Sequence, residues 1–364
     1  MIKQVNELKA KALIDKKVAE AAVLGGAVLG GGGGGWIEEG QRLAAFALKK
    51  GFTSIWPLES LSSDDLVLTV SVVGAPSAGK KGLWSEDYSR AVEYFLQRTK
   101  AKVFGLISSE VGATAVVNGW VQSVQLDIPV LDAAANGRAH PLGLMGSMGL
   151  HRQKGFFSQQ AAVGRDSSGR RVEGFFQGTI EETSAAVRKM AGNTGGMVAV
   201  ARNPVPAAYV KKHGAPGAIS MAIRIGQIYQ QKKNLPPAQL MEAILRQFGD
   251  GAVYQGKVEK FALRQSGGFD VGQIQVKGPA GWYELVFLNE YLTLERNGRR
   301  LATFPDLIMT FVANSGRPVI SAALKKDLEV FILTSPKNNL VLGAGGKDRS
   351  LLRRVEAILG KKII

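Results

Sequence analysis

The sequence predicts an α/β N-terminal domain with parallel strands, followed by a β-rich C-terminal domain. In the first half, apolar strand-like segments alternate with helix-like segments at spacings that require crossover connections, and such connections join parallel strands. In the last third, short alternating segments are separated by Gly, Pro and Asn, which is typical of a β-rich barrel or sandwich. A chain of 364 residues is long enough for two domains with separate cores.

The elements of the first domain follow from their apolar patterns. Residues 66–73 form a continuous apolar run, as in a strand that is buried on both faces. Ser85 is a good helix cap, and Glu86 and Asp87 fall in the first turn after it. In chain order we expect helices at 2–24 and 41–50, a strand at 66–73, a helix at 85–97, a strand at 102–108, a helix at 113–126 and a strand at 128–132.

A charged Gly/Ser segment, GRDSSGRR from Gly164, indicates a linker or an exposed turn, and we place the domain boundary there. In the second domain the pair Asn297-Gly298 is a strong hairpin signal, and the closing LLRRVEAIL is expected to be a helix that packs on either domain. The predicted organisation is an α/β domain at 1–165 and a C-terminal domain at 172–364, helical at 183–248 and β-rich at 256–333.

Composition limits the classes of function. The formal net charge is +16, but the basic residues are scattered in doublets without an aromatic-interleaved stripe, so nucleic-acid binding is not favoured. No cysteine occurs, which excludes disulfides, thiolate metal ligands and a cysteine nucleophile. Residues 18–36 are rich in glycine and contain Glu20, so they fit neither a membrane span nor a secretory signal. We therefore expect a cytoplasmic protein that does not enter a membrane.

A phosphate-binding loop is suggested by Gly74, Gly79 and Lys80, which match G-x-x-x-x-G-K behind the apolar run. That motif needs a hydroxyl directly after the lysine to hold Mg²⁺, and a helix that starts at that point. Lys81 stands there instead, and the first good helix cap is Ser85. A plain connection from strand to helix is therefore favoured over a nucleotide site.

Six consecutive glycines, Gly30 to Gly35, interrupt the first α/β unit. Each glycine costs about 0.5–1 kcal/mol more to order than alanine, so an ordered run implies a close approach to its backbone. Amides without side chains can form a concave nest for an anion or a carbonyl oxygen, and a mobile loop is the alternative. The candidate substrate-binding residues in this run are Gly31, Gly32, Gly33 and Gly34.

A second cluster lies where two expected parallel strands end. Glu110 and Asp132 are placed at the carboxyl ends of these strands, where open α/β sheets bind their ligands. Two carboxylates there can act as base and acid or bind a cation, while Arg138 can hold an anionic or carbonyl group and His140 can shuttle a proton. Alternatively, Asp132 caps the next turn, Arg138 pairs with it, and His140 is a satisfied loop histidine. No pair among the three histidines has metal-ligand spacing, so no metal ligands are assigned.

The order of several motifs resembles the S-methyl thiohydantoin desulfurase-like family over almost the whole chain. The resemblance implies an N-terminal α/β domain, a β-rich C-terminal domain and association with hydantoinase/oxoprolinase-type proteins. The motifs are AVLGGGGGGW, VVGAP, SSEVGA, IPVLDAAANGRAHP, NPVPAAYVKKHGAPGAISMAIRIG, GKVEKFALRQSGGFDVGQIQV, FLNEYLTLERNGRRLATFPDLI and SGRPV.

The activity implied by the resemblance is hydrolysis of an S-methylated thiohydantoin to the hydantoin, with loss of methanethiol. Such attack of water on an amidine-like carbon needs a base, a donor for the polar ring atoms and a shaped pocket. On this basis the glycine loop would face the ring, Glu110 or Asp132 would activate water, and Arg138 would hold the ring carbonyl. The alternative is a relative without catalysis that binds a metabolite or pairs with a hydantoinase-type subunit. The sequence assigns no cofactor and leaves a homo-oligomer open.

The chain departs from the family pattern at several polar positions. Between Asp132 and Leu142 the family has Asp-Ala-Asp-Gly-Met-Gly-Arg-Ala-Phe-Pro-Glu, so its second aspartate is replaced by Ala134 and its glutamate by Leu142. Ala115 stands where an asparagine is usual, and Lys80 or Lys81 lies near a usual glutamate. The loss of carboxylates argues against a metal site, and it favours a changed substrate or a protein without catalysis.

Overall fold

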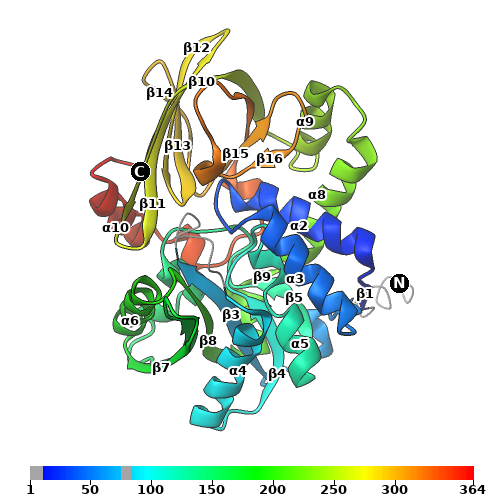
Figure 1. The fold of residues 1–364 in the computed structure, drawn as a ribbon, viewed down its shortest axis with the longest axis vertical. Coiled ribbons are helices and arrows are strands. Elements are labelled where there is room, and N and C mark those ends of the chain that lie inside the picture. The colour runs from blue at the N-terminus through cyan, green and yellow to red at the C-terminus, as the bar shows by residue number, and fades with distance from the viewer. Residues whose placement is uncertain (1–10, 75–82) are drawn as a thin grey trace.

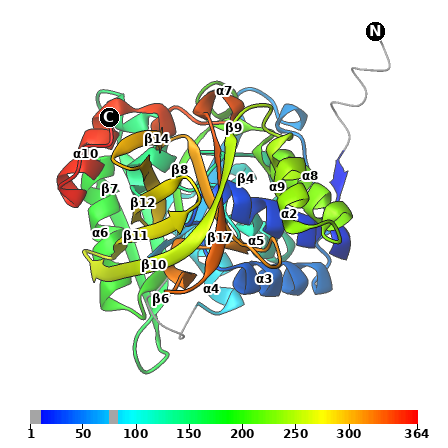
Figure 2. The ribbon, with the colours of Figure 1, turned by 90° about the horizontal axis from the view of Figure 1, so that it is seen from above.

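The computed structural model describes residues 11–74 and 83–364 and shows a two-domain architecture (Figure 1). Within this part of the chain, one domain is built on a mixed seven-stranded sheet with helices, and the other on an antiparallel eight-stranded sheet. We call them the mixed-sheet domain and the antiparallel-sheet domain. Seen from above, the antiparallel sheet crosses over the mixed-sheet domain (Figure 2).

The mixed-sheet domain contains two classes of element. Its strands are β3 (Leu66–Gly74), β4 (Val103–Ser108), β5 (Val130–Ala134), β6 (Ser158–Arg165), β7 (Arg171–Gly178), β8 (Met197–Pro206) and β9 (Ala215–Pro216), in the order β7-β6-β8-β3-β4-β5-β9. Its helices are α2 (Lys16–Gly30), α3 (Ile37–Lys49), α4 (Ser85–Thr99), α5 (Trp120–Leu126), α6 (Ile180–Asn193), α7 (Ala207–His213) and α8 (Ala218–Lys232). A separate pair, β1 (Ala12–Leu13) and β2 (Ser54–Ile55), lies outside the sheet.

The parallel strands that the sequence predicts are present but form only part of the sheet. β3, β4 and β5 are parallel neighbours, joined through α4 and α5. β8 pairs antiparallel with β3 on one side and with β6 on the other, so the sheet is mixed. The segment GRDSSGRR forms the exposed turn of the hairpin between β6 and β7, and the amide of Asp166 donates to the carbonyl of Arg170 there.

Strand β8 corrects the expectation that residues 183–248 are helical, because it lies within them. Its sequence, MVAVARNPVP, is mostly apolar and is buried along most of its length between two neighbouring strands. The strands on either side of the GRDSSGRR turn, β6 and β7, therefore belong to one sheet together with β8. A sheet-forming segment of ten residues between two polar helices was not recognised from the sequence.

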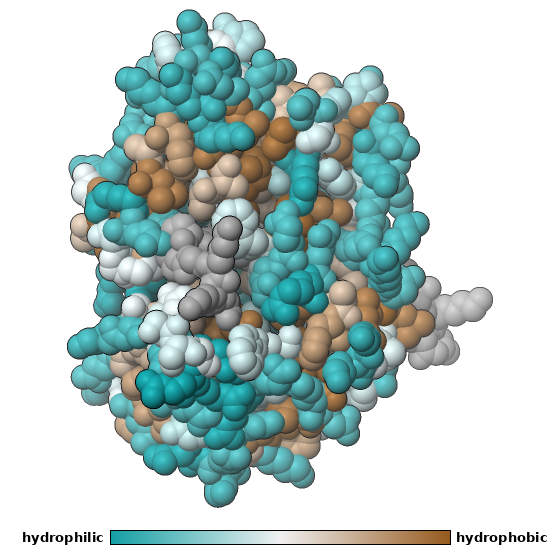
Figure 3. Space-filling view, in the orientation of Figure 1, coloured by the Kyte–Doolittle hydropathy of each residue, from teal (hydrophilic) through white to brown (hydrophobic). Residues whose placement is uncertain are grey.

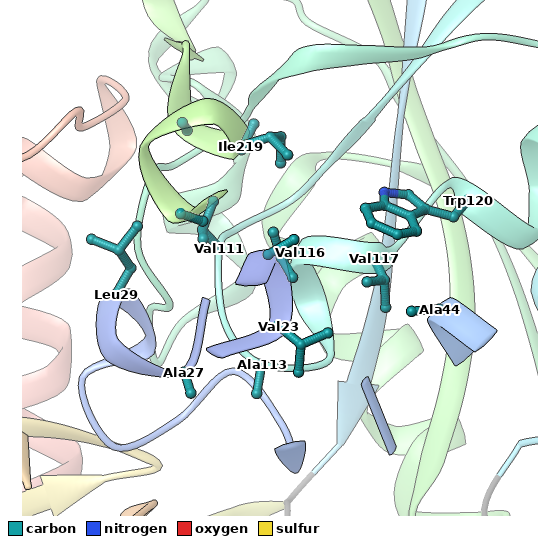
Figure 4. Close-up of a cluster of buried hydrophobic side chains, with 14 of the residues drawn as sticks. Val23, Ala27, Leu29, Ala44, Val111, Ala113, Val116, Val117, Trp120 and Ile219 are labelled. Atoms are coloured by element: carbon teal, nitrogen blue, oxygen red, sulfur yellow. The ribbon is translucent and has the colours of Figure 1, made fainter. Parts of the chain in front are cut away.

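Both faces of the parallel strands are covered, as their continuous apolar sequences require. Alternate residues of a strand point to opposite faces. Leu68 and Val70 of β3 join the core packed with α2 to α5 and α8, whereas Val67 lies in a separate cluster with residues near α7. Figure 4 shows part of the first of these cores, where Val23 of α2 lies close to Val116.

The antiparallel-sheet domain begins after α9 (Pro237–Leu245). Its strands are β10 (Ala252–Ser266), β11 (Phe269–Gly278), β12 (Gly281–Leu288), β13 (Glu290–Arg296), β14 (Arg299–Thr303), β15 (Leu307–Val312), β16 (Pro318–Val319) and β17 (Glu329–Ser335), in the order β14-β13-β12-β11-β10-β17-β15-β16. Asn297 and Gly298 have positive φ and form the tight turn between β13 and β14, as predicted. The closing helix, α10 (Arg349–Leu359), packs its apolar side against residues of both domains, among them Met145 and Leu292.

Helices α2 and α8 approach each other so closely that side chains are excluded at the crossing. A Cβ added to Gly25 would overlap the carbonyl of Ala222 on α8, and one added to Gly226 would overlap the carbonyl of Ala21 on α2. Gly25 in the segment 18–36 therefore serves helix packing. In the described residues no helix is long and apolar enough to cross a membrane. On the face shown in Figure 3, hydrophilic side chains spread over both domains and apolar residues form small separate patches.

We predict that Gly226→Ala lowers the free energy of unfolding by at least about 2 kcal/mol, because the added methyl group has no space between α2 and α8. The matched control is Gly192→Ala in α6, where a Cβ meets nothing within 4 Å. That change should raise stability by about 0.5–1 kcal/mol, since alanine orders more easily than glycine in a helix. Urea unfolding followed by circular dichroism measures both, and equal effects would contradict the packing.

Candidate functional site

A cavity of about 600 Å³ lies beyond the carboxyl ends of β3 and β4 and is bordered by the turn between β12 and β13. The position agrees with the rule that open α/β sheets bind ligands beyond the carboxyl ends of their strands. Both domains contribute to its wall. The polar and charged lining residues are Glu38, Glu39, Arg42, Ser71, Ser109, Glu110, Thr114, Asn118, His140, Arg188, Arg202, Asn289 and Glu290.

The glycine run is an ordered bridge between the domains. Helix α2 ends at Gly30, and the chain then turns through positive φ at Gly31, Gly32, Gly34 and Gly35, a conformation that glycine adopts without strain. The carbonyl of Gly31 accepts a hydrogen bond from the amide of Tyr291, and that of Gly32 accepts one from the amide of Ser321. The alternative of a mobile loop does not describe this segment.

The structure gives Gly31, Gly32 and Gly33 a role in packing. A Cβ on Gly31 would overlap the guanidinium of Arg138, one on Gly32 would meet the ring of Tyr291, and one on Gly33 would overlap the carboxyl group of Glu290. Of the run, only Gly34 and the adjacent Gly35 line the cavity. We expected four glycines of the run to face a substrate. Of these, only Gly34 lies in the wall of the cavity, because the antiparallel-sheet domain and Arg138 cover the other three.

Glu110 is the second residue after the end of β4 and lies in the wall of the cavity. Its carboxylate accepts a hydrogen bond of 3.2 Å from the amide of His140. Burial raises the pKa of Glu110 to about 7, although this amide and the charges of nearby arginines act in the opposite direction. A carboxyl group with a pKa near 7 can take up and release a proton at neutral pH.

His140 lies beside Glu110, with 3.5 Å between its Nε2 atom and the carboxylate. Burial, followed by the charge of Arg202, lowers the pKa of His140 to about 3, so the ring is neutral at neutral pH. Neither ring nitrogen makes a hydrogen bond with the described residues. Both ring nitrogens are thus buried without a hydrogen-bond partner, so the alternative of a satisfied loop histidine does not describe His140.

Several charged residues of the cavity were missed by sequence reasoning, among them Arg188, Arg202 and Glu290. Arg202 on β8 donates to the Oγ atom of Ser109 at 2.7 Å, and burial lowers its pKa to about 10, which leaves it protonated. Arg188 on α6 has its pKa lowered to about 10 by burial in the same way. Burial and the neighbouring Glu110 raise the pKa of Glu290 well above its ordinary value. The sequence offered one signal for Arg202, which is a lone arginine within the apolar run MVAVARNPVP. It offered no signal for Arg188 or Glu290.

Asp132 does not join Glu110 at the cavity, which corrects the expected convergence of the two acids. Its carboxylate accepts hydrogen bonds from the amide of Ser220 at 3.0 Å and from the Oγ atom of Ser220 at 2.6 Å. Ser220 lies in the first turn of α8, where backbone amides have no partner within the helix. Asp132 therefore acts as a capping carboxylate, which was the alternative to a catalytic role, because a negative charge stabilises a helix N-terminus.

Arg138 is fully buried outside the cavity and neither faces a ligand nor pairs with Asp132. It donates to the carbonyls of Pro305 and Asp306, and its guanidinium lies 4.6 Å from the centre of the Phe304 ring. These contacts fasten the loop after β5 to the antiparallel-sheet domain.

Two further sequence-based considerations concern metals and phosphate. Among residues 11–74 and 83–364, no group of three or more His, Asp or Glu side chains is placed to hold a metal ion. Gly79 and Lys80 of the phosphate-loop pattern lie outside the described residues. Ala115 lines the cavity, whereas Ala134 and Leu142 are buried in the protein and are not among its lining residues.

The fold and the site define a class: two-domain proteins that enclose a small-molecule cavity between a mixed sheet and an antiparallel sheet. The chain belongs to the S-Me-THD-like family, because the model of its N-terminal domain matches residues 18–166 and that of its C-terminal domain matches residues 179–346. Membership of this family suggests a desulfurase- or hydrolase-like function.

The fold is shared with a protein from Chromobacterium violaceum whose crystal structure is known. The two are 20% identical in sequence, and the match has a TM-score of 0.70 and covers 96% of each chain. A comparison with curated proteins found no match. The solved structure therefore supports the architecture, and the chemistry must be argued from the residues of the cavity.

We predict that Asp132→Ala lowers the free energy of unfolding by about 1 kcal/mol, because it removes the cap of α8. It should leave ligand binding in the cavity unchanged. The control is Asp64→Ala at an exposed position, where the change should stay within about 0.5 kcal/mol. Urea unfolding measures both variants. Unaltered stability together with lost turnover would return Asp132 to the catalytic residues.

Proposed function

We propose that the protein hydrolyses a small cyclic amide of the hydantoin type, an S-methyl thiohydantoin or a close relative, by attack of water on the amidine-like carbon. The observation that carries this proposal is Glu110, a partly buried carboxyl group in the wall of the cavity whose pKa is raised by desolvation to about 7. A general base works best when its pKa lies near the operating pH. The family to which the chain belongs supports the same class of reaction.

In the proposed reaction Glu110 takes a proton from water as the water oxygen bonds to the carbon that carries the methylthio group. The bond from carbon to sulfur then breaks, and the sulfur leaves as methanethiol after taking a proton back from Glu110. The second hydrogen of water ends on the ring nitrogen as the carbonyl forms. No oxidant or reductant is needed, because water and the thioimidate yield the hydantoin and a thiol.

Other residues of the cavity fit the remaining tasks. Negative charge develops on the ring as water attacks, and fixed donors that point at this charge lower the barrier. Arg202 is protonated, buried and held by Ser109, so it can stabilise this charge without reorganising. The neutral His140 can accept or donate a hydrogen bond with a ring atom. Gly34 and Gly35 line the same cavity, and their amides donate no hydrogen bond within the described residues, so they remain available to a carbonyl oxygen.

We predict that the protein releases methanethiol from S-methyl thiohydantoins and that Glu110→Gln lowers kcat/KM by at least about 100-fold, because it removes the base. Thiol release is followed with a chromogenic thiol reagent. The matched control is Glu39→Gln, which also alters a carboxyl group of the cavity wall but one already paired with Arg42. Equal losses in both variants, or full activity in Glu110→Gln, would refute the assignment.

The pH profile gives an independent test. Because burial raises the pKa of Glu110 to about 7, the base is protonated in acid, and kcat/KM should rise with pH and level off above about 7. Initial rates between pH 5 and pH 9 measure this limb. A limb centred near the ordinary glutamate value of 4.5 would mean that another group acts as the base.

A second candidate is a protein without catalysis that binds a hydantoin-type metabolite or pairs with a hydantoinase-type subunit. Ala115 favours it, because this residue presents a methyl group to the cavity where the family usually has an asparagine. A panel of hydantoins and thiohydantoins separates the two candidates. A rise in melting temperature without turnover of any member would support the binding protein.

A further inference from the structure

A second cavity, of about 690 Å³, lies between the turn that joins β14 to β15, the short 3₁₀ helix Lys337–Asn339 and the start of α10. The cavity that contains Glu110, here called the main cavity, shares none of its lining residues with this one. Small-molecule sites in proteins have volumes of roughly 300–1,000 Å³. The second cavity is therefore large enough for a ligand of its own, and the proposed reaction gives it no role.

The floor of the second cavity, by which we mean its buried lining residues, is apolar. It consists of Phe304, Pro305, Leu340 and Leu352. Arg138 fixes the first two, because its guanidinium lies 4.6 Å from the centre of the Phe304 ring and donates to the carbonyl of Pro305 at 3.2 Å. An apolar surface gains free energy when an apolar group of a ligand replaces water against it.

The rim, by which we mean the exposed lining residues, is basic. Its cationic side chains are Lys337, Lys347 and Arg349. None of the three forms an ion pair with a carboxylate of residues 11–74 and 83–364. The acidic side chain of the lining, Asp306, is already engaged, because it accepts hydrogen bonds from the amides of Lys337 at 2.9 Å and Thr303 at 3.2 Å. Several like charges around one cavity attract an anion.

The rim cations project from backbone that is held in place. Lys347 and Arg349 flank Asp348, which is buried. The carboxylate of Asp348 caps α10 by accepting from the amide of Ser350 at 2.8 Å, and it lies 2.8 Å from the Nε2 atom of His151. The amide of Lys337 is fixed on Asp306, as described above. A ligand at the rim therefore meets positions that exist before it binds, which reduces the entropy lost on binding.

We propose that the second cavity binds a small organic anion, a compound that joins an apolar body to a carboxylate or a phosphate group. The apolar body lies on the floor and the anionic group lies among the rim cations. Lysine and arginine side chains bind both kinds of anionic group. This inference goes beyond the proposed function and does not rest on it, because the two cavities have no lining residue in common.

The test compares ligands that carry both parts with ligands that carry one. Isothermal titration calorimetry at pH 7, in a buffer free of phosphate and carboxylates, measures their binding. Phenyl phosphate and phenylacetate carry both parts, inorganic phosphate carries the anionic group alone, and phenylacetamide is a neutral counterpart of phenylacetate. We expect phenyl phosphate or phenylacetate to bind at least about tenfold more tightly than each of the last two. The tighter ligand of the two identifies the preferred anionic group.

A pair of double variants locates the binding. Lys337→Gln/Arg349→Gln removes rim cations from two different elements and should weaken binding of the tighter ligand by at least about tenfold. The matched control is Lys325→Gln/Arg353→Gln, which removes the same number of charges from exposed residues that do not line the cavity. The control should bind as the unaltered protein does. All four changes are at exposed positions, so both variants should keep the melting temperature of the unaltered protein.

Three results would overturn the second site. The first is that neither phenyl phosphate nor phenylacetate binds, or that phenylacetamide or inorganic phosphate binds as tightly as they do. The second is that both double variants weaken binding equally, because the anion then responds only to the overall charge. The third is that Arg188→Gln weakens binding while Lys337→Gln/Arg349→Gln does not, because the anion then enters the main cavity, which Arg188 lines.

Discussion

The antiparallel-sheet domain reaches the mixed-sheet domain along a segment that has no side chains. Gly31, Gly32 and Gly33 lie directly against Arg138, Tyr291 and Glu290, and any Cβ there would push these groups away. The carbonyls of Gly31 and Gly32 take hydrogen bonds from the antiparallel-sheet domain, and that of Gly34 takes one from Thr114. This close approach brings Glu290 into the wall of the cavity, so the shape of the cavity depends on it.

The chemistry of the site follows from the burial of its charged groups. Desolvation is the largest cause of the raised pKa values of Glu110 and Glu290 and of the lowered pKa values of His140, Arg188 and Arg202. Groups whose pKa values are displaced in opposite directions within one cavity are typical of catalytic or ligand sites. Arg138 contributes from outside, since its bonds to Pro305 and Asp306 hold the two domains together.

Local patterns in the sequence were sufficient for part of the fold. The apolar run of β3, the capped helix α4 and the Asn297-Gly298 turn each depend on neighbouring residues, and all are present. Strand β8 was missed because its place between β3 and β6 is set by pairing with distant strands. The parallel order of β3, β4 and β5 was accessible, whereas the antiparallel strands that make the sheet mixed were not.

The candidate site, like the fold, could be predicted from the sequence only in part. Glu110 was placed near the cavity because its position after an apolar strand is encoded locally, and His140 lies in the loop that follows the next strand. Asp132 has the same local position, but its side chain turns to the N-terminus of α8, which only the tertiary packing shows. Glu290 comes from a turn about 180 residues from Glu110 along the chain, so no spacing rule could join them.

The central claim is that the glycine contact encloses Glu110, and a carbon-13 NMR titration of the glutamate carboxyl groups tests it most directly. The signal of Glu110 is assigned by its loss in Glu110→Gln. The account predicts that this signal titrates at about pH 7, well apart from exposed glutamates. A midpoint near the ordinary value of 4.5 would show that the carboxyl group is open to water and would contradict the account.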